Sequence, residues 1–331
     1  MPKEKLLILG GTEFVGRQLV ETLSGFDQYE LYLFNRGQTN PKIFPLANRI
    51  IGDRETDDIR KIGQYKWDYI VDFSSYFPAS LNRTLEHVNK DVKRYIYIST
   101  ISVYSLAHHD GLSAIDESFK KKPFEDEQLE TPGLQFYGEK KAACEQILKR
   151  NSWLKAIILR PAVIYGKYDP TDRLYYWIER IQNKRQLILP DHGDYRMSLT
   201  YGPDMVKTIM SGLSGGLKPG TYNCVSDRPY AFRFILETIR DELKSDCEFI
   251  SIPANLLRNR KLSTREFPLW WGYDVWIDNG HLKNASDLDF SDPEESFRKT
   301  AQFYAGLSWP KPKAGFSHEA EEQVLTELGL N

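Results

Sequence analysis

An apolar run that ends in glycines near the amino terminus constrains this chain more than any other feature. Residues 6–9 (LLIL) predict a buried parallel strand, and residues 10–16 (GGTEFVG) follow it directly. Val15, Leu19 and Leu23 recur every four residues, which predicts a helix with one apolar face. Such a turn either makes a tight corner only or binds a phosphate, because free N–H groups and the positive end of the helix dipole meet there.

Length and charge narrow the choice of fold and partner. The 331 residues can form one large α/β unit or two smaller ones. The chain has 44 Lys and Arg against 46 Asp and Glu, a formal net charge of −2. This balance gives no strong field for nucleic acid or an anionic membrane.

The sequence has no clear signal peptide or membrane-spanning segment, and its cysteines do not suggest disulfides or a metal site. The apolar part of the amino terminus is too short for a signal peptide, and no run of eighteen apolar residues follows, so no membrane span is expected. The three cysteines, Cys144, Cys224 and Cys247, are far apart and lack metal-ligand spacing. We therefore expect reduced thiols in a cytoplasmic protein.

Strand and helix patterns alternate through the first half of the chain. Four further strands are predicted at 30–35, 49–53, 67–74 and 93–100, with helices between them. The polar residues at the ends of the five strands are Gly10, Arg36, Asp53, Ser74 and Thr100. Because ligands bind at the carboxyl ends of parallel strands, the pattern predicts a doubly wound parallel sheet of the Rossmann type that binds a dinucleotide.

The end of the second strand bears on cofactor choice. An acid there binds both ribose hydroxyls of NAD, whereas an arginine accommodates the 2′-phosphate of NADP. Asn35 and Arg36 occupy this place, which favours NADP slightly. Arg36 is alternatively a solvated turn residue before Gly37, and Glu13 would oppose an extra phosphate, so the choice between NAD and NADP stays open.

Residues 106–135 predict a surface loop or lid, since they combine charge clusters with two prolines. His108 and His109 lie in this stretch. No carboxylates or cysteines accompany them at ligand spacing, so solvent exposure is the better interpretation and no metal site is expected.

Tyr137 and Lys141 are the chemical centre that the sequence indicates. They are four residues apart at the start of a predicted helix and share one face of it. A tyrosine has a pKa of about 10, and a nearby ammonium group stabilises its phenolate, so the phenol becomes a usable acid or base. Thr100, at the end of the fifth strand, would hold the substrate oxygen. Taken alone, the pair also fits a solvated helix face.

The combined motifs resemble the extended short-chain dehydrogenase/reductase family, which includes NAD-dependent sugar epimerases, dehydratases and reductases. The matching features are the turn at 10–16, Gly52-Asp53, residues 99–104 (STISVY), Tyr137 with Lys141, Arg160-Pro161 followed by Tyr165-Gly166, and residues 201–204. The turn, the FNRG ending and the YDPTDR segment are most similar to a branch near the chloroplast stem-loop binding proteins, for which RNA binding has been described.

The resemblance implies roles for these positions. Tyr137 would be the catalytic acid/base, Lys141 would bind the nicotinamide ribose and tune the tyrosine, and Thr100 would complete the triad. Asp53 would lie at the adenine and Pro161 to Val163 beside the nicotinamide. The predicted cofactor residues are Gly10, Thr12, Glu13, Phe14, Val15, Gly16, Asn35, Arg36, Asp53, Arg54, Ser74, Ser99, Tyr137, Lys141, Pro161 and Val163.

Two departures from the family pattern qualify that expectation. Glu13 stands where the family usually has its middle glycine, which would alter the pyrophosphate contact and weaken cofactor affinity. Ile101 and Ser102 stand where sugar dehydratases have an Asp-Glu pair, so dehydration by that route is not expected.

Candidate substrate residues lie mostly in the second half of the chain. An aromatic and charged stretch supplies Tyr168, Asp172, Arg173 and Trp177, which suit either contact with a sugar or nucleobase or packing at a domain junction. Arg196 either binds a diphosphate or makes a surface ion pair. Residues 265–277 are rich in aromatics that predict core or an oligomer face, although Trp270 or Trp271 could close over a ligand.

The sequence thus predicts a Rossmann domain from residues 1–165 and 196–228 and a smaller substrate-binding domain from residues 166–195 and 229–331. The favoured function is an NAD(P)-dependent epimerase or reductase that acts on a sugar or nucleotide sugar, as a possible homodimer. Thr100, Tyr168, Asp172, Arg173, Trp177, Arg196 and Trp270 would contact the substrate. The alternative is a non-catalytic or RNA-binding protein on the same fold.

Overall fold

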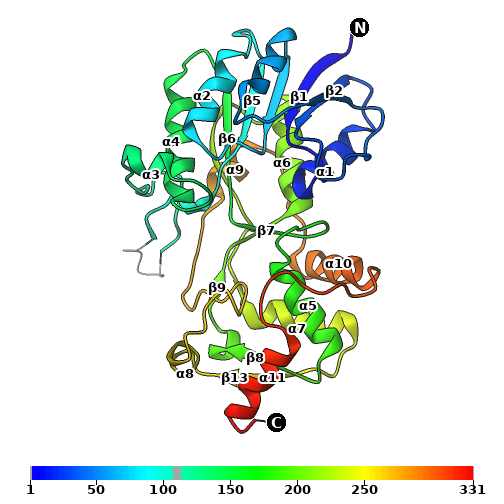
Figure 1. The fold of residues 1–331 in the computed structure, drawn as a ribbon, viewed down its shortest axis with the longest axis vertical. Coiled ribbons are helices and arrows are strands. Elements are labelled where there is room, and N and C mark those ends of the chain that lie inside the picture. Colours follow the sequence, from blue (N-terminus) through cyan, green and yellow to red (C-terminus); the bar gives the residue numbers. More distant parts are fainter. Residues whose placement is uncertain (1, 107–112, 331) are drawn as a thin grey trace.

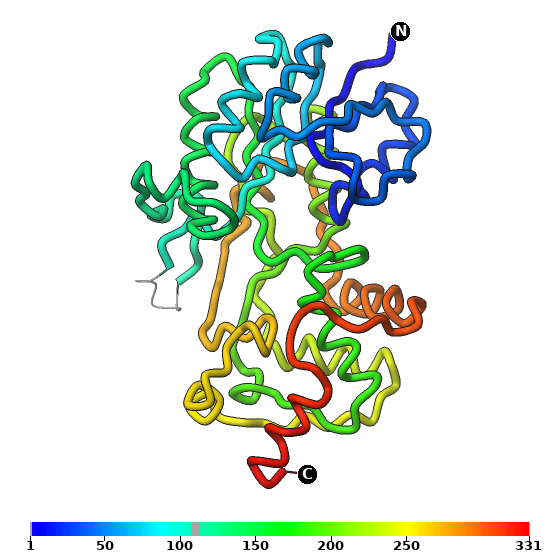
Figure 2. The backbone as a smooth tube through the Cα atoms, in the orientation of Figure 1, coloured from blue at the N-terminus to red at the C-terminus, as the bar shows by residue number. Residues whose placement is uncertain are grey.

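The computed structural model describes residues 2–106 and 113–330. Its upper part in Figure 1 is a sheet covered by helices, and its lower part is a smaller assembly of helices and short strands. Figure 2 shows that the chain crosses between the two parts several times. The predicted His108 and His109 lie outside the described residues.

One parallel sheet forms the centre of the upper part. Its strands are β1 (Glu4–Leu9), β2 (Tyr29–Asn35), β3 (Asn48–Ile51), β4 (Tyr69–Asp72), β5 (Arg94–Ile98), β6 (Ala156–Pro161) and β11 (Gly220–Cys224). The spatial order of these seven strands is β11-β6-β5-β4-β1-β2-β3, and each adjacent pair is parallel. The predicted doubly wound sheet is confirmed.

The alternation of side chains along β1 explains why both faces of the sheet are covered. Leu6 and Ile8 pack into the core on one face, whereas Leu7 and Leu9 pack into the core on the other. The helical segments of this part are α1 (Phe14–Leu23), η1 (Asp57–Gln64), α2 (Pro78–Glu86), η2 (Ile101–Val103), α3 (Asp126–Glu130), α4 (Tyr137–Arg150), α6 (Gly202–Ser214) and α9 (Gly280–Ala285).

The lower part has its own core around Trp177 and Phe232. Its elements are α5 (Arg173–Asn183), β8 (Gln186–Pro190), η4 (Asp191–Gly193), β9 (Arg196–Met197), β12 (Tyr230–Ala231), α7 (Phe232–Leu243), β13 (Glu248–Ile252), α8 (Ala254–Asn259), α10 (Pro293–Ala305) and α11 (His318–Glu327). The short parallel pair of β7 (Val163–Tyr165) and β10 (Leu199–Tyr201) lies between the two parts.

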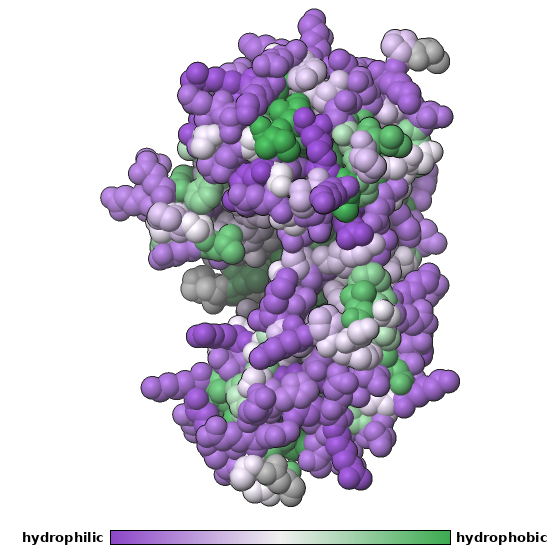
Figure 3. All heavy atoms as spheres, turned by 45° about the vertical axis from the view of Figure 1, so that its right-hand side comes forward, coloured by the Kyte–Doolittle hydropathy of each residue, from purple (hydrophilic) through white to green (hydrophobic). Residues whose placement is uncertain are grey.

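The two parts of the molecule exchange segments of chain more often than the predicted domain boundaries imply. Helix α9 falls within residues 229–331, yet its Leu282 packs into the core beneath the sheet. The visible face of the molecule is largely hydrophilic, with separate apolar patches (Figure 3). None of the helices that the structure describes is both long and apolar enough to span a membrane. All three cysteines are buried free thiols.

A buried ion pair joins helix α4 to strand β6. The side chains of Glu145 and Arg160 are both 0% exposed, and their carboxylate and guanidinium groups make two hydrogen bonds of 2.8 and 2.6 Å. Ser99 Oγ donates to the same carboxylate at 2.8 Å, and Lys121 Nζ lies 3.0 Å from it. Burial raises the pKa of Glu145, but Arg160 outweighs this effect and holds that pKa below its ordinary value.

Replacing Glu145 with glutamine should destabilise the protein strongly. The change leaves the Arg160 charge buried without its partner, which costs about 3–5 kcal/mol. Chemical denaturation at pH 7 would measure the loss. Glu139→Gln on the same helix is the matched control, because Glu139 lies 3.7 Å from Lys122 in a partly exposed pair worth less than about 1 kcal/mol. Equal losses for the two variants would contradict the assignment.

Candidate active site

The glycine turn between β1 and α1 has the backbone that a phosphate site needs. Gly10 and Gly11 have φ angles of +110° and +91°, which favour glycine. A Cβ on Gly16 would lie 2.9 Å from the Cα of Gly11, so this position also requires glycine. Glu13 is extended, with φ −140° and ψ 150°, and its side chain makes no capping hydrogen bond to α1. The backbone therefore accepts glutamate at position 13 without strain.

Two cavities meet above this turn. One has a volume of about 420 Å³ and the other about 690 Å³, and both are lined by Glu13, Phe73 and Tyr76. Each of the sixteen predicted cofactor residues lines one of the two cavities. The smaller cavity lies at the ends of β2, β3 and β4, and the larger reaches Tyr137. This arrangement fits a dinucleotide, with the adenosine half in the smaller cavity and the nicotinamide half in the larger.

The smaller cavity, where adenosine is predicted to bind, is lined by Asn35, Arg36 and Asp53. Asn35 Nδ2 donates to the Gly10 carbonyl at 3.3 Å, and its Oδ1 accepts from Gly37 N at 2.9 Å, so this side chain holds the two loops together. Arg36 is exposed on the cavity wall. Asp53 accepts a hydrogen bond from Glu55 N at 2.9 Å. The preference for NADP stays a prediction.

Arg54 lines the same cavity, but its charge is directed into the protein. Its guanidinium donates to Asp72 at 2.7 and 3.2 Å, to Ser74 Oγ at 3.0 Å and to Thr84 Oγ1 at 2.8 Å. Arg54 is 6% exposed. Arg54 therefore has a structural role, in which it fixes the loop that carries Ser74, and its contact with a cofactor stays a prediction.

Thr100, Tyr137 and Lys141 converge on the larger cavity. Thr100 caps η2 at the end of β5, where its Oγ1 donates to Ser102 Oγ at 3.2 Å and accepts from Ser102 N at 3.1 Å. Tyr137 is the first residue of α4, so Lys141 lies one helical turn further along. Lys141 Nζ donates to the Ile98 carbonyl at 2.7 Å and lies 4.6 and 5.0 Å from the ring centroids of Tyr97 and Tyr76.

The electrostatics of this triad differ from the expectation. Burial raises the pKa of Tyr137 to about 12, whereas Thr100 and Arg173 lower it. Burial also lowers the pKa of Lys141 to about 8. Lys141 does not depress the pKa of Tyr137 below its ordinary value as predicted, because burial dominates and the ammonium group bonds to a backbone carbonyl. The phenol is protonated at neutral pH and is ready to donate a proton.

The larger cavity also has four aromatic residues outside the predicted site residues, namely Phe73, Tyr76, Trp271 and Tyr273. Of these, the sequence pattern offers Trp271 only as an alternative to Trp270. Tyr76 is 40% exposed, and its ring centroid lies 6.2 Å from that of Tyr137. Trp271 and Tyr273 line the same cavity from the segment after α8. Tyr76 follows the polar strand end at Ser74 by two residues, so an extended search of strand ends would have found it. The sequence alone gave no means to choose Trp271 over Trp270.

Of the seven predicted substrate residues, Thr100 and Arg173 line the larger cavity at Tyr137. The other five are not among the described residues that line it. Trp177 is fully buried in the lower core, where its indole donates to the Pro268 carbonyl at 2.6 Å. Trp270 packs against Phe267 in the same core. Their expected substrate contact is corrected to core packing, because apolar burial outweighs exposure of such large rings.

The other three of these residues are engaged elsewhere. The Arg17 guanidinium lies 3.7 Å from the ring centroid of Tyr168. Asp172 accepts a hydrogen bond from the backbone of Lys313 at 3.0 Å. Arg196 is exposed at strand β9, where its backbone N–H donates to Asp274 Oδ1 at 2.7 Å. The predicted diphosphate contact of Arg196 thus finds no support in the lining of the cavity.

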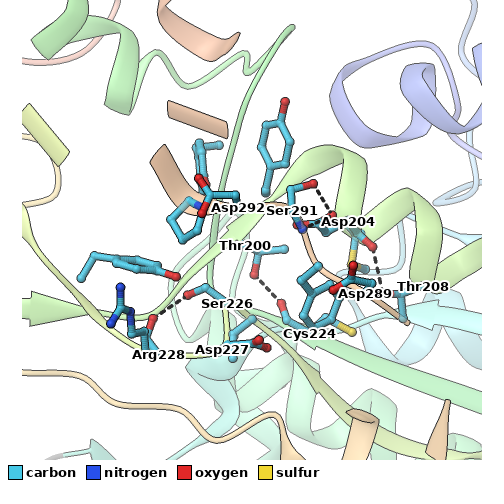
Figure 4. Close-up of a pocket in the computed structure, with 17 residues that line it drawn as sticks. Thr200, Asp204, Thr208, Cys224, Ser226, Asp227, Arg228, Asp289, Ser291 and Asp292 are labelled. Carbon is cyan, nitrogen blue, oxygen red and sulfur yellow. Dashed lines mark hydrogen bonds between the residues drawn. The ribbon is translucent and has the colours of Figure 1, made fainter. Parts of the chain in front are cut away.

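A separate cavity of about 500 Å³ is shown in Figure 4. Its described lining shares no residue with the larger cavity at Tyr137. Asp204 in its wall accepts hydrogen bonds from the backbone and hydroxyl of Ser291 and pairs with Lys207 at 2.9 Å. Asp227 pairs with Lys283 at 2.9 Å. Asp204 therefore connects α6 to the segment before α10, and Asp227, which follows β11, connects to α9.

Comparison with known proteins finds one matching family and two curated relatives. The model of the NAD dependent epimerase/dehydratase family matches residues 6–224. The uncharacterized protein YbjS of Escherichia coli (strain K12) is 26% identical over 176 residues, which cover 50% of this chain and 48% of YbjS. The chloroplast stem-loop binding protein of 41 kDa b of Arabidopsis thaliana is 24% identical over 231 residues, covering 64% and 55%. The matches thus span about half the length of these curated relatives.

Solved structures share the fold over nearly the whole chain. UDP-glucuronic acid 4-epimerase from Bacillus cereus, in complex with NAD, superposes with a TM-score of 0.71 at 15% identity. The superposition covers 92% of this chain and 99% of that one. At this identity the likeness establishes the fold.

Lys141→Met should stabilise the ligand-free protein at neutral pH. The folded pKa lies near 8 instead of the ordinary 10.5, so the buried charge costs roughly 3 kcal/mol. Between those two pH values the unfolded chain binds the extra proton, so the wild type gains stability as pH rises. The advantage of the variant is therefore greatest below pH 8 and disappears near pH 10.5.

Denaturation of both proteins across pH 6–10 would measure this difference. Exposed Lys155 provides the control, since Lys155→Met should change stability by less than about 0.5 kcal/mol. A pH-independent gain for Lys141→Met would contradict the electrostatic explanation.

Proposed function

The chain belongs to the NAD dependent epimerase/dehydratase family, and on this premise we propose that it is a nicotinamide-dependent epimerase or reductase of a sugar or nucleotide sugar. One observation supports this proposal above the others. Thr100, Tyr137 and Lys141 share a cavity that continues, through Glu13, Phe73 and Tyr76, into the cavity at the glycine turn. A redox cofactor and an acid/base group would therefore act on the same C–O group of the substrate, with the hydride exchanged at its carbon and the proton at its oxygen.

In the proposed reaction, Tyr137 exchanges a proton with the substrate oxygen, which the Thr100 hydroxyl orients. The nicotinamide, when bound, supplies or accepts the hydride. With a pKa of about 12, Tyr137 acts directly as an acid. Action as a base needs more positive charge beside the phenol, and Lys141 on the same helix face is the residue that can provide it.

The cofactor is proposed to be NAD or NADP, with a slight preference for NADP because of Asn35 and Arg36. Glu13 faces both cavities and is exposed. Its negative charge opposes the phosphates of a dinucleotide at the start of α1, where the helix otherwise attracts anions.

Glu13→Gln should therefore tighten binding of NAD and NADP by about three- to tenfold, since an exposed charge contributes on the order of 1 kcal/mol. Isothermal titration calorimetry at low salt would measure it, and the gain should shrink at high salt. Unchanged affinity at both salt concentrations would show that Glu13 does not face the phosphates. Absence of any binding by the wild type would remove the proposed function itself.

Tyr137→Phe should reduce kcat by about 10²–10⁴-fold while leaving dinucleotide affinity within about twofold, because only the transferable proton is lost. Turnover on a panel of sugars and nucleotide sugars, followed by nicotinamide absorbance or product epimerisation, would measure it. Tyr195→Phe is the control, since Tyr195 is a buried phenol of the lower core. Full activity of Tyr137→Phe would reject Tyr137 as the acid/base. Absence of turnover by the wild type on the whole panel would favour a non-catalytic scaffold, although the near-neutral charge does not support RNA binding.

A further inference from the structure

We propose that the substrate carries an oxyanion, a carboxylate or a phosphate, close to its reacting carbon, and that Arg173 binds this group. The inference rests on the proposed function, because it assigns the substrate class of the same cavity. It depends on the chemistry of one wall, formed by Pro170, Thr171 and Arg173 at the start of α5.

The Arg173 side chain lines the larger cavity and has no ion-pair partner among the described residues. Two basic side chains, Arg173 and Lys141, are among the described lining residues of the larger cavity. Lys141 is buried and donates to the Ile98 carbonyl. Arg173 is half-buried, and no carboxylate among the described residues forms an ion pair with it, in contrast to Arg160 and Arg54. A guanidinium in this position can still bind an anion.

A chain of hydrogen bonds sets the orientation of this guanidinium. Arg173 Nε donates to Thr171 Oγ1 at 2.9 Å, and Thr171 Oγ1 donates in turn to Asp169 Oδ1 at 2.6 Å. Thr171 N donates to the same Asp169 oxygen at 2.9 Å, and Asp169 is buried. The Nε edge is therefore occupied, whereas no described protein group accepts from the two Nη groups. These two groups form the fork that binds a carboxylate or phosphate in a bidentate manner.

The surroundings favour a charged ligand over a neutral hydroxyl. Arg173 is half-buried and shares the cavity wall with the half-buried Trp271. A partly desolvated guanidinium gains most from an opposite charge, because hydrogen bonds to charged groups are roughly twice as strong as neutral ones. Glu13 is the acidic residue among the described lining, and it belongs to the wall shared with the smaller cavity.

The position of Arg173 places the anion near the reaction. Its charge acts on Tyr137, whose pKa it lowers against the effect of burial. An unneutralised anion beside the substrate oxygen would raise that pKa further and slow proton transfer. Arg173 would therefore bind the substrate and protect the acidity of Tyr137 at the same time.

Calorimetry can test the proposal with three probes: glucuronate, glucose 1-phosphate and glucose, each with and without saturating dinucleotide. Wild type should bind at least one anionic probe at least tenfold more tightly than glucose. Arg173→Gln should remove about 10- to 100-fold of that affinity, and Arg173→Lys should retain part of it. Arg185→Gln is the matched control, because Arg185 is exposed at the start of β8 and outside the cavity.

Thr171 offers a second readout, as a positioning residue. Thr171→Val should weaken the anionic probe several-fold, and Thr171→Ser should restore it, because serine keeps the hydroxyl that orients Nε. For an anionic substrate, Arg173→Gln should also shift the pH profile of kcat upward. A structural role alone would produce neither the rescue nor the pH shift.

The results of these binding experiments test the anion site at Arg173 separately from the proposed nicotinamide-dependent function. Preference for glucuronate identifies a carboxylate, and preference for glucose 1-phosphate identifies a phosphate. Equal binding of glucose, an unchanged preference in Arg173→Gln, or no Arg173-dependent binding up to about 10 mM would overturn the proposal. Anion binding through Arg173 without dinucleotide binding would leave the anion site in place and reject the proposed redox function.

Discussion

The buried ion pair between Glu145 and Arg160 is the interaction on which the geometry of the candidate site depends. Glu145 lies two helical turns after Tyr137 on α4, and Arg160 immediately precedes Pro161 on β6. The pair therefore joins helix α4, which carries Tyr137, to the strand that ends at Pro161, where the nicotinamide is proposed to bind. Ser99 joins the same carboxylate next to Thr100. Such a network is costly to desolvate, and its hydrogen bonds restrict the three elements to one arrangement.

In the absence of ligands, the charges around Tyr137 favour the protonated phenol, so that proton donation is favoured over proton acceptance. Burial keeps the phenol protonated and reduces the charge on Lys141, so the two residues do not yet form the phenolate–ammonium pair that the sequence predicts. Arg173 contributes the positive charge that does reach the phenol. Ligand charge would consequently decide how acidic Tyr137 becomes, which couples substrate chemistry to catalysis through electrostatics.

The sequence predicted the sheet and the convergence of the triad because both follow from local rules. Buried strands have a recognisable pattern, and parallel strands bring their carboxyl ends, with Gly10, Asp53 and Thr100, to one edge. Neighbouring aromatics do not follow such a rule. Trp270 enters the core and Trp271 lines the cavity, and the tertiary packing that separates them has no local signal. Arg54 likewise follows the end of strand β3, but its ion-pair partner Asp72 belongs to strand β4. No local pattern in the sequence indicates this pairing.

The walls of the catalytic cavity have two origins along the chain. The glycine turn, Thr100, Tyr137 and Arg173 all lie within residues 6–224, the stretch that matches the family. Trp271 and Tyr273 lie beyond it, in a segment that the family model does not describe. The proposed reaction therefore depends on residues of the shared stretch, whereas the shape of the proposed substrate site depends partly on residues outside it. Family membership alone consequently constrains the type of reaction more closely than the identity of the substrate.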